Sequence, residues 1–457
     1  MAGESKIMKA KNPEKKYYII SFGCQMNELD TEVISGLLEN IGYMPASDYH
    51  EADLLLINTC AVRQKAEDKV AAFLGELRSW KKERKGRMLA VGGCMPQQKE
   101  IARYLQKNFK HVDIIWGTHS LPHLPDLIYE AQETQDTIVD IEESYAKREG
   151  LPVTRKSNMQ AWVPIIYGCT NYCSYCIVPY VRGRERSRST ENIIEEVKQL
   201  AEQGYKEITL LGQNVNAYGK DLADGSNFTH LLDKLDEIDG IERIRFLTSH
   251  PRDFEFKMIE VIANSRHICE HFHLPLQAGS NHILQKMNRG YTREHYFELI
   301  KNIRGMIPGA SITTDLIVGF PGETEEDFDQ TLEMVELVKF DAAYTFVYSK
   351  RKGTPAANLP EQISPEVKKE RIERLIKLQQ SIGWEVNQQL VGQTVEVLVE
   401  GTSKNDPEKL TGRTRTNKLV HFPGDISWKG CLCPVIITDA QTWYLSGEIA
   451  KEEKTYI

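Results

Sequence analysis

Three cysteines with the spacing C-x3-C-x2-C constrain this 457-residue chain more than any other feature. Cys169, Cys173 and Cys176 follow the apolar run at residues 162–167, so the sequence predicts that they lie on a loop after a strand. Zinc fingers usually combine two C-x2-C halves, or one such half with two histidines, and this spacing does not match them. Clustered thiols in a chain without a disulfide framework are usually metal ligands or catalytic groups. The motif therefore predicts a site where three thiols act together.

Composition limits where this chemistry takes place. The nine cysteines are an odd number, and the first 16 residues are charged rather than apolar, which argues against secretion and against a disulfide framework. No apolar run approaches the roughly 18 residues of a membrane-spanning helix. The net charge of −8 means that a nucleic acid would have to bind at a local basic patch. We expect a cytoplasmic protein of about two to four domains that is not bound to a membrane.

The N-terminal part of the chain contains three more cysteines in equivalent positions. Cys24, Cys60 and Cys94 each come just after a short apolar run that predicts a buried strand, within an alternating pattern of strands and helices. Ligands bind at the carboxyl ends of strands in such open sheets. A single free cysteine, however, is more often a packing residue than a ligand. Three cysteines at equivalent strand ends favour ligands around one group, with glycines that allow close backbone approach. The runs are residues 17–22, 53–57 and 88–91, and the glycines are Gly23, Gly92 and Gly93.

A strand–helix pattern continues after the C-x3-C-x2-C motif. Its first helix has Thr190 as the predicted N-cap and an apolar stripe that ends at Gly204. Five apolar runs, together with the run before Cys169, predict six strand–helix units. Barrels built from such units carry their reactive groups on the loops after the strands. The five runs are residues 207–211, 243–248, 271–274, 311–318 and 342–347.

Polar residues and glycines on these loops are candidates for contacting a cofactor. Glycine allows the backbone to approach a ligand, and Gln or Ser side chains can form hydrogen bonds to it. For His250, a structural hydrogen bond and a catalytic role are both open, because the sequence does not show its partner. The other candidates are Gly212, Gln213, Asn214, Ser249, Gln277, Ser280 and the segment 319–323, which begins with Gly319.

The C-terminal residues 391–447 have the composition of short strands joined by turns, which predicts a small antiparallel β-barrel. A basic stretch within it is either a solvated strand face or a surface that follows phosphates. Arginines alternating on one strand face, with Thr between them, favour RNA. The basic residues are Lys409, Arg413, Arg415 and Lys418.

A second basic run lies just after the cluster motif and makes an anionic substrate plausible at the reaction centre. It contains Arg182, Arg184, Arg186 and Arg188. The remaining cysteines are expected to be packing residues. They are Cys269, Cys431 and Cys433.

Together, these segments resemble the radical S-adenosylmethionine (SAM) methylthiotransferases, most closely the MiaB-type branch that acts on tRNA. The resemblance covers nearly the whole chain. It is carried by FGCQMN at Cys24, NTCAVRQKAEDKV at Cys60, GGCMPQ at Cys94, YGCTNYCSYCIVPYVRGRERSRS at Cys169, LPLQAGSN at Leu274, RGYTRE at Arg289, TDLIVGFPGET at Thr314 and LTGRTRTN at Leu410.

The resemblance implies an α/β protein with three domains. These are an N-terminal open parallel α/β sheet domain at 15–131, a radical SAM core with a partial (βα)6 barrel at 159–386 and an RNA-binding TRAM barrel at 388–451, with 132–158 as a linker. It also implies two 4Fe–4S clusters, an auxiliary one at the three N-terminal cysteines and one for SAM at the C-x3-C-x2-C motif. SAM would contact Tyr175 and the loop residues named above, and two SAM molecules would be used per turnover, one as methyl donor and one as radical source.

The implied reaction adds a methylthio group to carbon 2 of N6-isopentenyladenosine next to the anticodon. The implied partners are a tRNA anticodon stem-loop and an electron donor such as flavodoxin or ferredoxin, and we expect a monomer. Within the family, N6-threonylcarbamoyladenosine and a ribosomal-protein aspartate are alternative substrates. A noncatalytic RNA-binding protein with structural metal sites is the alternative from another class.

Overall fold

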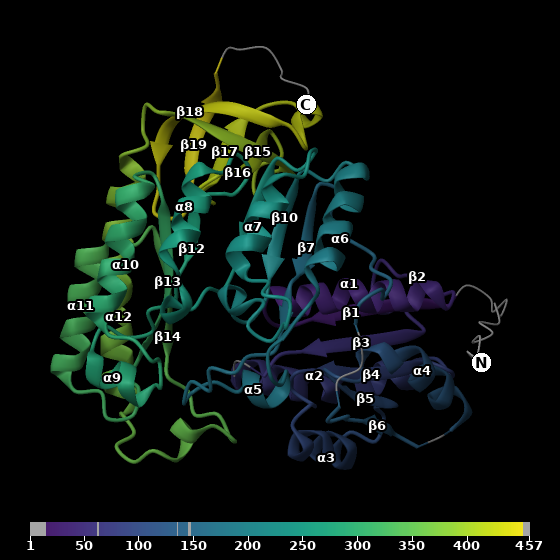
Figure 1. Cartoon of the computed structure of the whole chain (residues 1–457). Helices are drawn as coiled ribbons and strands as arrows, with labels where there is room; N and C mark the ends of the chain where they lie inside the picture. The colour runs from purple at the N-terminus through teal and green to yellow at the C-terminus, as the bar shows by residue number, and fades with distance from the viewer. Residues whose placement is uncertain (1–14, 62–63, 135, 145–147, 451–457) are drawn as a thin grey trace. The chain divides into compact units, whose positions relative to one another are not determined.

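The computed structural model describes residues 15–61, 64–134, 136–144 and 148–450, and the side chains of residues 64–68 lie outside this description (Figure 1). The chain forms two compact units. Unit 1 contains the chain up to Ser157 together with Gly168–Thr170 and Cys176–Arg184; unit 2 contains Asn158–Tyr167, Asn171–Tyr175 and the chain from Glu185 onwards. None of the described helices is long and apolar enough to cross a membrane.

Unit 1 is built on a six-stranded sheet with the order β2-β1-β3-β4-β5-β6, in which all neighbours are parallel. Helices α1 and α4 pack on one face and α2 and α3 on the other, each pair over its own apolar cluster (Figure 1). The central strands β3 and β4 are buried at every residue, as expected for a parallel sheet covered on both faces. This confirms the predicted open α/β sheet. The strands are β1 (Lys16–Ser21), β2 (Met44–Pro45), β3 (Leu54–Thr59), β4 (Met88–Gly93), β5 (Ile114–Gly117) and β6 (Ile138–Asp140); the helices are α1 (Gln25–Asn40), α2 (Gln64–Glu83), α3 (Lys99–Asn108) and α4 (Leu124–Glu133).

The segment 132–158, predicted as a linker, contributes to unit 1. Strand β6 lies within it and pairs in parallel with β5, and the backbone N–H of Thr154 donates to the carbonyl of Glu32 on α1 at 3.0 Å. An edge strand of three residues needs few apolar side chains, so its sequence resembles a polar connection. Part of the predicted linker is therefore a piece of the sheet.

The core of unit 2 has six parallel strands in two sheets, with the orders β11-β10-β7 and β12-β13-β14. A parallel bridge between Ile244 and Ile268 continues the pairing from β11 to the residues before β12. This arrangement confirms the six predicted strand–helix units. The strands are β7 (Gln160–Pro164), β10 (Glu207–Leu211), β11 (Arg243–Phe246), β12 (His271–His273), β13 (Ser311–Val318) and β14 (Ala342–Val347). The helices are α5 (Val178–Val181, in unit 1), α6 (Thr190–Glu202), α7 (Phe228–Asp236), α8 (Phe256–Asn264), α9 (Asn281–Lys286), α10 (Arg293–Met306), α11 (Glu325–Val338) and α12 (Pro365–Gln388).

Two local predictions in this core were wrong. The strand predicted at 162–167 is interrupted after Pro164, and the short β8 (Ile166–Tyr167) pairs instead with β9 (Arg186–Ser187). Proline has no N–H for the sheet ladder, so the chain leaves the sheet there. The N-cap of α6 is Ser189, whose hydroxyl accepts from the N–H of Asn192, whereas the hydroxyl of Thr190 bonds to Tyr218 in the interior.

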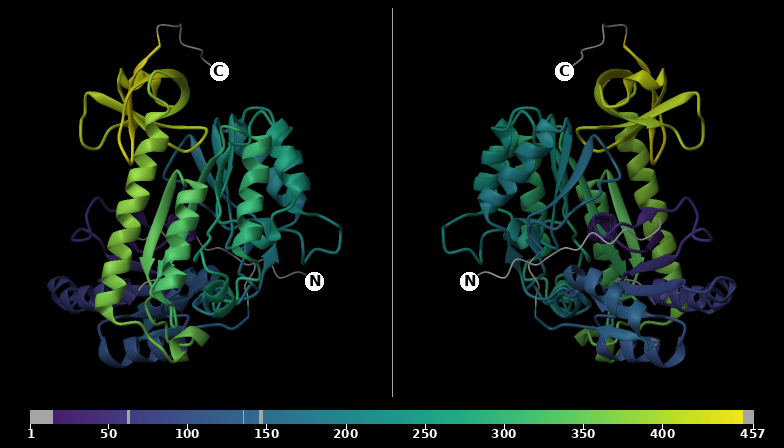
Figure 2. Two further views of the ribbon diagram at one scale, coloured as in Figure 1. Left: turned by 90° about the vertical axis from the view of Figure 1, so that its left-hand side faces the viewer. Right: turned by 90° about the vertical axis from the view of Figure 1, so that its right-hand side faces the viewer.

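The C-terminal strands form a closed barrel with the order β15-β16-β17-β19-β18, at the end of the long helix α12 (Figure 2). All neighbouring strands are antiparallel except β17 and β19, which are parallel. A closed ring of five strands cannot alternate direction all the way round, so one parallel pair is unavoidable. The strands are β15 (Thr394–Thr402), β16 (Lys409–Thr414), β17 (Leu419–Pro423), β18 (Leu432–Ala440) and β19 (Leu445–Ile449).

Candidate functional site

The three N-terminal cysteines lie at the carboxyl edge of the unit 1 sheet, after β1, β3 and β4. Gly23 has φ +141°, and a Cβ there would lie 2.9 Å from the Cβ of Cys60, so this backbone conformation and close approach require glycine. The N–H of Cys94 donates to the carbonyl of Thr59 at 3.0 Å, next to Cys60. Burial raises the pKa of Cys94; the guanidinium of Arg182 opposes this, and the charge of Cys24 adds to it. The structure thus brings the three predicted ligands together.

Helix α1 supplies polar side chains beneath these cysteines. Cys24 is the N-cap residue of α1, and Asn27 in its first turn is fully buried. The Asn27 amide donates to the carbonyl of Thr59 at 2.9 Å, and its oxygen accepts from Arg182 at 3.2 Å. Sequence reasoning missed Asn27 and Asp30, although their position in the helix among buried apolar residues was a usable signal.

Arg182 is buried against this group, with only 6% of its surface exposed. Its Nε lies 3.3 Å from the Sγ of Cys94, and its Nη2 donates to the carboxylate of Asp30 at 2.7 Å. Ile177 and Val181 hold it there by packing against Cys94 in one apolar cluster. The prediction that Arg182 contacts RNA was therefore wrong, because its guanidinium is not accessible to a phosphate.

Charge pairing keeps both members of this buried pair ionised. Burial alone would raise the pKa of Asp30, but the guanidinium groups of Arg182 and Arg148 lower it below its ordinary value. Burial alone would lower the pKa of Arg182. The opposite charge of Asp30 acts against burial, and the pKa of Arg182 is raised well above its ordinary value. A permanent positive charge therefore lies beside the sulfur of Cys94.

The cysteine motif is held by backbone contacts within each unit. In unit 1 the N–H of Cys169 donates to the carbonyl of Gly183 at 2.9 Å; Cys169 is buried and Cys176 is half-buried. In unit 2 the N–H of Ser174 donates to the carbonyl of Met287 at 3.0 Å, and its hydroxyl donates to the carbonyl of Lys286 at 2.8 Å. These bonds fix the loop that carries Cys173 against the end of α9.

The sulfur of Cys173 lies beside a buried arginine, as the sulfur of Cys94 does. The Nη1 of Arg289 lies 3.3 Å from the Sγ of Cys173 and 3.5 Å from the hydroxyl of Tyr175, the predicted SAM contact. The Nε of Arg289 donates to the hydroxyl of Tyr291 at 3.1 Å. The motif RGYTRE contains Arg289, but its local pattern gives no sign of this contact.

The predicted SAM loops lie at the carboxyl ends of the unit 2 strands, and most of their candidate residues are buried. Asn214 donates from its amide to Asp253 at 2.9 Å, and its oxygen accepts from the N–H of His250 at 3.2 Å. The hydroxyl of Ser249 and the Nε2 of His250 are buried without a partner among the described residues. Burial and the charge of Arg289 lower the pKa of His250 to about 2, so its ring is neutral. Gln277, with φ +72°, Gly212 and Gln213 also lie just after strand ends.

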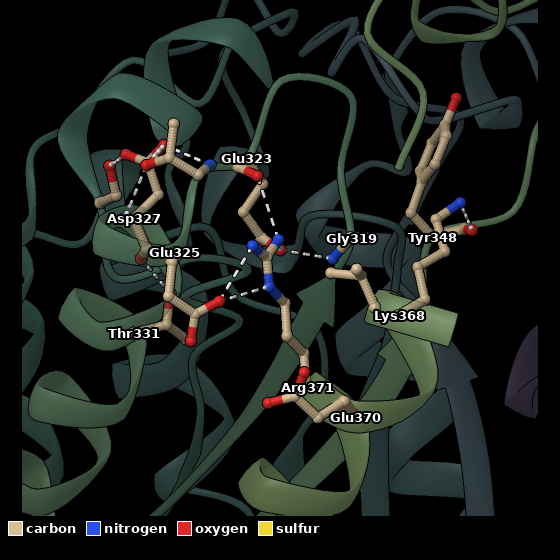
Figure 3. A network of polar contacts seen from close by, with 12 residues as sticks. Gly319, Glu323, Glu325, Asp327, Thr331, Tyr348, Lys368, Glu370 and Arg371 are labelled. Atoms are coloured by element: carbon tan, nitrogen blue, oxygen red, sulfur yellow. Dashed lines mark hydrogen bonds and ion pairs between the residues drawn. The ribbon is translucent and has the colours of Figure 1, made fainter. Parts of the chain in front are cut away.

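The segment that begins at Gly319 is closed by a polar network (Figure 3). The carboxylate of Glu323 accepts from the N–H of Gly319 at 2.7 Å and from Arg371 of α12 at 2.8 Å. Burial raises the pKa of Glu323 to about 7, although the Gly319 N–H and Arg371 oppose this. The carboxylate of Glu323 therefore holds the loop closed. A Cβ at Gly319 would meet the side chain of Lys368.

The basic stretch of the barrel is split between two roles. Arg415 pairs with Glu270 at 2.7 Å, and Lys418 pairs with Asp341 at 2.5 Å, so both tie the barrel to the core of unit 2. Their predicted RNA contacts are corrected accordingly, because these paired side chains are only 24% and 13% exposed. Lys409 and Arg413 also form ion pairs, with Asp406 and Glu400, but their side chains are 49% and 38% exposed, and Arg184 in unit 1 is also exposed.

Comparisons with known proteins match three separate parts of the chain. Residues 163–335 match the radical SAM superfamily, residues 16–117 match the uncharacterized protein family UPF0004, and residues 388–450 match the TRAM domain. The chain is 54% identical to the tRNA-2-methylthio-N(6)-dimethylallyladenosine synthase of Desulforamulus reducens, over 98% of both chains. It is 55% identical to that of Pelotomaculum thermopropionicum, over 95% of this chain and 97% of the relative.

The chain belongs to the tRNA-2-methylthio-N(6)-dimethylallyladenosine synthase family.

Solved structures support the fold. The radical SAM methyltransferase TsrM of Kitasatospora setae, determined with tryptophan and a SAM analogue, aligns with a TM-score of 0.54 over 86% of this chain and 80% of that chain, at 14% identity. The same protein was also solved with cobalamin and a [4Fe–4S] cluster. This likeness concerns the fold alone.

The cofactors implied by this family are 4Fe–4S clusters and SAM, and the residues present fit them. Thiolates are the soft ligands that iron–sulfur clusters require, and each set of three has a guanidinium that donates to one sulfur. The unpartnered buried atoms of Ser249 and His250 are free to bond to a polar ligand at the strand ends of unit 2.

Proposed function

We propose that this chain transfers a methylthio group to carbon 2 of N6-isopentenyladenosine next to the anticodon of tRNA. The observation that carries the proposal is the pair of cysteine triads, one in the C-x3-C-x2-C motif and one at the carboxyl edge of the unit 1 sheet. Relatives that are 54% identical over 98% of the chain are named for the same dimethylallyl (isopentenyl) substrate, which supports this choice over other modified adenosines.

Each triad is assigned one 4Fe–4S cluster. Cys169, Cys173 and Cys176 would hold the cluster that serves SAM, and the N-terminal triad would hold the auxiliary cluster. When bound, the clusters and SAM would supply one-electron chemistry and a methylated sulfur. Side chains cannot replace this chemistry, because the hydrogen on carbon 2 is too weakly acidic for a general base to remove. The N-terminal ligands are Cys24, Cys60 and Cys94.

The chain's own residues bind, orient and enclose the reactants. Arg182 and Arg289 orient one cysteine sulfur of each triad, and Ser249 with His250 offers polar atoms at the proposed SAM site. The network of Glu323 keeps the backbone of the fifth loop in place. The proposed SAM-contacting residues are Tyr175, Gly212, Gln213, Asn214, Ser249, Gln277 and Gly319.

We assign the binding of tRNA to exposed basic side chains. Lys409 and Arg413 on the barrel, together with Arg184, remain candidates for phosphate contacts. A single-stranded anticodon loop suits the reaction because its bases can be turned out to expose carbon 2. The domain limits, the flavodoxin or ferredoxin electron donor, the monomeric state and the cytoplasmic location remain predictions from the sequence.

Nucleoside mass spectrometry tests this function directly. The purified, anaerobically reconstituted chain is incubated with SAM, a reductant and an anticodon stem-loop that carries N6-isopentenyladenosine. We expect its 2-methylthio derivative, and no product from a matched stem-loop with N6-threonylcarbamoyladenosine. Product only from the second stem-loop, or only on a ribosomal-protein aspartate, would move the chain to another branch of the family. No product with any substrate, despite full iron loading, would contradict the proposal.

A further inference from the structure

Arg289 lies in the motif RGYTRE, to which the proposed function assigns no reaction step. It follows the end of α9 in a tight turn, where its N–H donates to the carbonyl of Leu284 at 3.0 Å. Its neighbours Asn288 and Gly290 have φ values of +57° and +72°, a conformation that asparagine and glycine adopt most readily. This turn directs the side chain of Arg289 inward, where only 4% of the residue is exposed.

Each guanidinium nitrogen of Arg289 has a partner. Nη2 donates to the carbonyl of Pro275 at 2.9 Å, and Nε donates to the hydroxyl of Tyr291 at 3.1 Å. That hydroxyl donates in turn to the carbonyl of Leu276 at 2.8 Å. Nη1 is left to face the Sγ of Cys173 at 3.3 Å. The guanidinium is therefore fixed in one orientation, with Nη1 directed at the sulfur of Cys173.

No carboxylate among the described residues neutralises the charge of Arg289. Among the described residues, its partners are two tyrosine hydroxyls, a carbonyl and the sulfur of Cys173, whereas Arg182 is paired directly with Asp30. A buried charge without a counter-ion is costly, and a neutral thiol is only a weak acceptor. The arrangement becomes favourable when the sulfur of Cys173 carries negative charge, as it does in a ligand to iron.

We propose that Arg289 sets the reduction potential of the 4Fe–4S cluster at the C-x3-C-x2-C motif, by placing a hydrogen bond and an uncompensated positive charge on the sulfur of Cys173. This inference rests on the proposed function, because it assumes that cluster. The couple is a one-electron reduction of the cluster by an external donor, in which no bond breaks. Net charge and hydrogen bonds to the sulfurs are the protein's means of tuning such potentials. A positive charge favours the reduced form, so Arg289 raises the potential and is a positioning residue rather than a catalytic one.

The test measures the potential of this cluster alone. In the full-length chain, Cys24, Cys60 and Cys94 are replaced by Ala so that one cluster remains, and the reconstituted protein is titrated anaerobically with dithionite while its electron paramagnetic resonance signal is followed. Arg289→Met should shift the reduction equilibrium at least about tenfold toward the oxidised form, which is about 59 mV for a one-electron couple. Arg289→Lys, which keeps the charge, should recover most of the shift.

Arg245→Met is the matched control. Arg245 is also buried, and its guanidinium pairs at 2.8 Å with Glu207, the first residue of β10. It also donates to the backbone carbonyls of Thr414 and Arg415 in the barrel, so its contacts are not with the cysteine motif. We expect the potential of this variant to equal that of the parent. A full complement of iron with an unchanged potential in Arg289→Met would overturn the inference alone. Loss of iron from both Arg289 variants, with normal loading of the control, would also overturn it, because Arg289 would then serve assembly. A parent chain that forms no cluster would overturn the proposed function as well.

Discussion

The Nε of Arg182 lies 3.3 Å from the Sγ of Cys94, and the same guanidinium is paired with the buried carboxylate of Asp30. Arg182 comes six residues after the last cysteine of the C-x3-C-x2-C motif, yet its contacts are with the N-terminal triad. The segment that follows one cysteine triad thus helps to build the site of the other.

Replacing Arg182 by Met should destabilise unit 1. The change leaves the carboxylate of Asp30 with Arg148 as its remaining ion-pair partner, and breaking a buried pair in this way costs about 3 kcal/mol. Chemical unfolding of the apoprotein measures the loss. Arg184→Met is the matched control, because Arg184 is an exposed arginine two residues away and its loss should change stability by less than about 0.5 kcal/mol. Equal stabilities of the two variants would show that the Arg182–Asp30 pair contributes little.

Cysteine substitutions should separate the two clusters. Reconstituted wild-type protein should contain about eight irons per chain, and Cys60→Ala and Cys173→Ala about four each. Cys60→Ala should still cleave SAM to 5'-deoxyadenosine but form no methylthio product, whereas Cys173→Ala should do neither. Cys269→Ala, at a buried cysteine in neither triad, should keep the full iron content and both activities. Wild-type protein with about four irons, or with zinc, would rule out two clusters.

Glu323 should make the stability of unit 2 depend on pH. Its pKa is raised from 4.5 to about 7 in the folded chain, so between these values the folded state binds the proton more tightly than the unfolded state. The stability that this proton contributes is fully present below about pH 4.5 and is lost as the pH rises through about 7, a change of about 3 kcal/mol. Thermal unfolding of wild type and Glu323→Gln at pH 5 and pH 8 measures it. The wild type should lose more stability than the variant over this interval, and parallel pH profiles would contradict the assignment.

Lys409 and Arg413 in the barrel should behave differently toward RNA from Arg415. Lys409→Ala combined with Arg413→Ala should weaken tRNA binding and reduce the salt dependence of the binding constant by about 1.4 in slope, because two exposed phosphate contacts would be lost. Filter binding or fluorescence anisotropy at several salt concentrations measures the slope.

Arg415→Met should act on stability instead. It removes the ion pair with Glu270, whose partners are each about one-quarter exposed, so we expect a loss of about 1 kcal/mol and an unchanged salt slope. An unaltered slope in the Lys409 and Arg413 double variant would indicate that these residues form a solvated strand face and do not contact RNA. A reduced slope in Arg415→Met would restore its predicted RNA contact.

Local patterns in the sequence predicted most of the fold. The strands β10, β13 and β14 begin and end at the predicted residues, because their runs are rich in the β-branched, aromatic and other apolar residues that favour strands. The edge strand β6 escaped prediction, because at a sheet edge a half-buried segment of three residues carries too little periodic signal. The break after Pro164 was overlooked although proline marks it in the sequence.

The sequence by itself determined the two cysteine triads and their places after strands, since spacing and strand ends are local properties. Only the tertiary structure decided what surrounds them. Arg182 meets Cys94 across 88 residues of sequence and Arg289 meets Cys173 across 116, and no local pattern reports such a pairing. The same holds for Arg415 and Lys418, which read as a basic surface in the sequence but are paired with Glu270 and Asp341 in the fold. A charged residue's role depends on whether folding buries it beside an opposite charge, and that depends on contacts between distant parts of the chain.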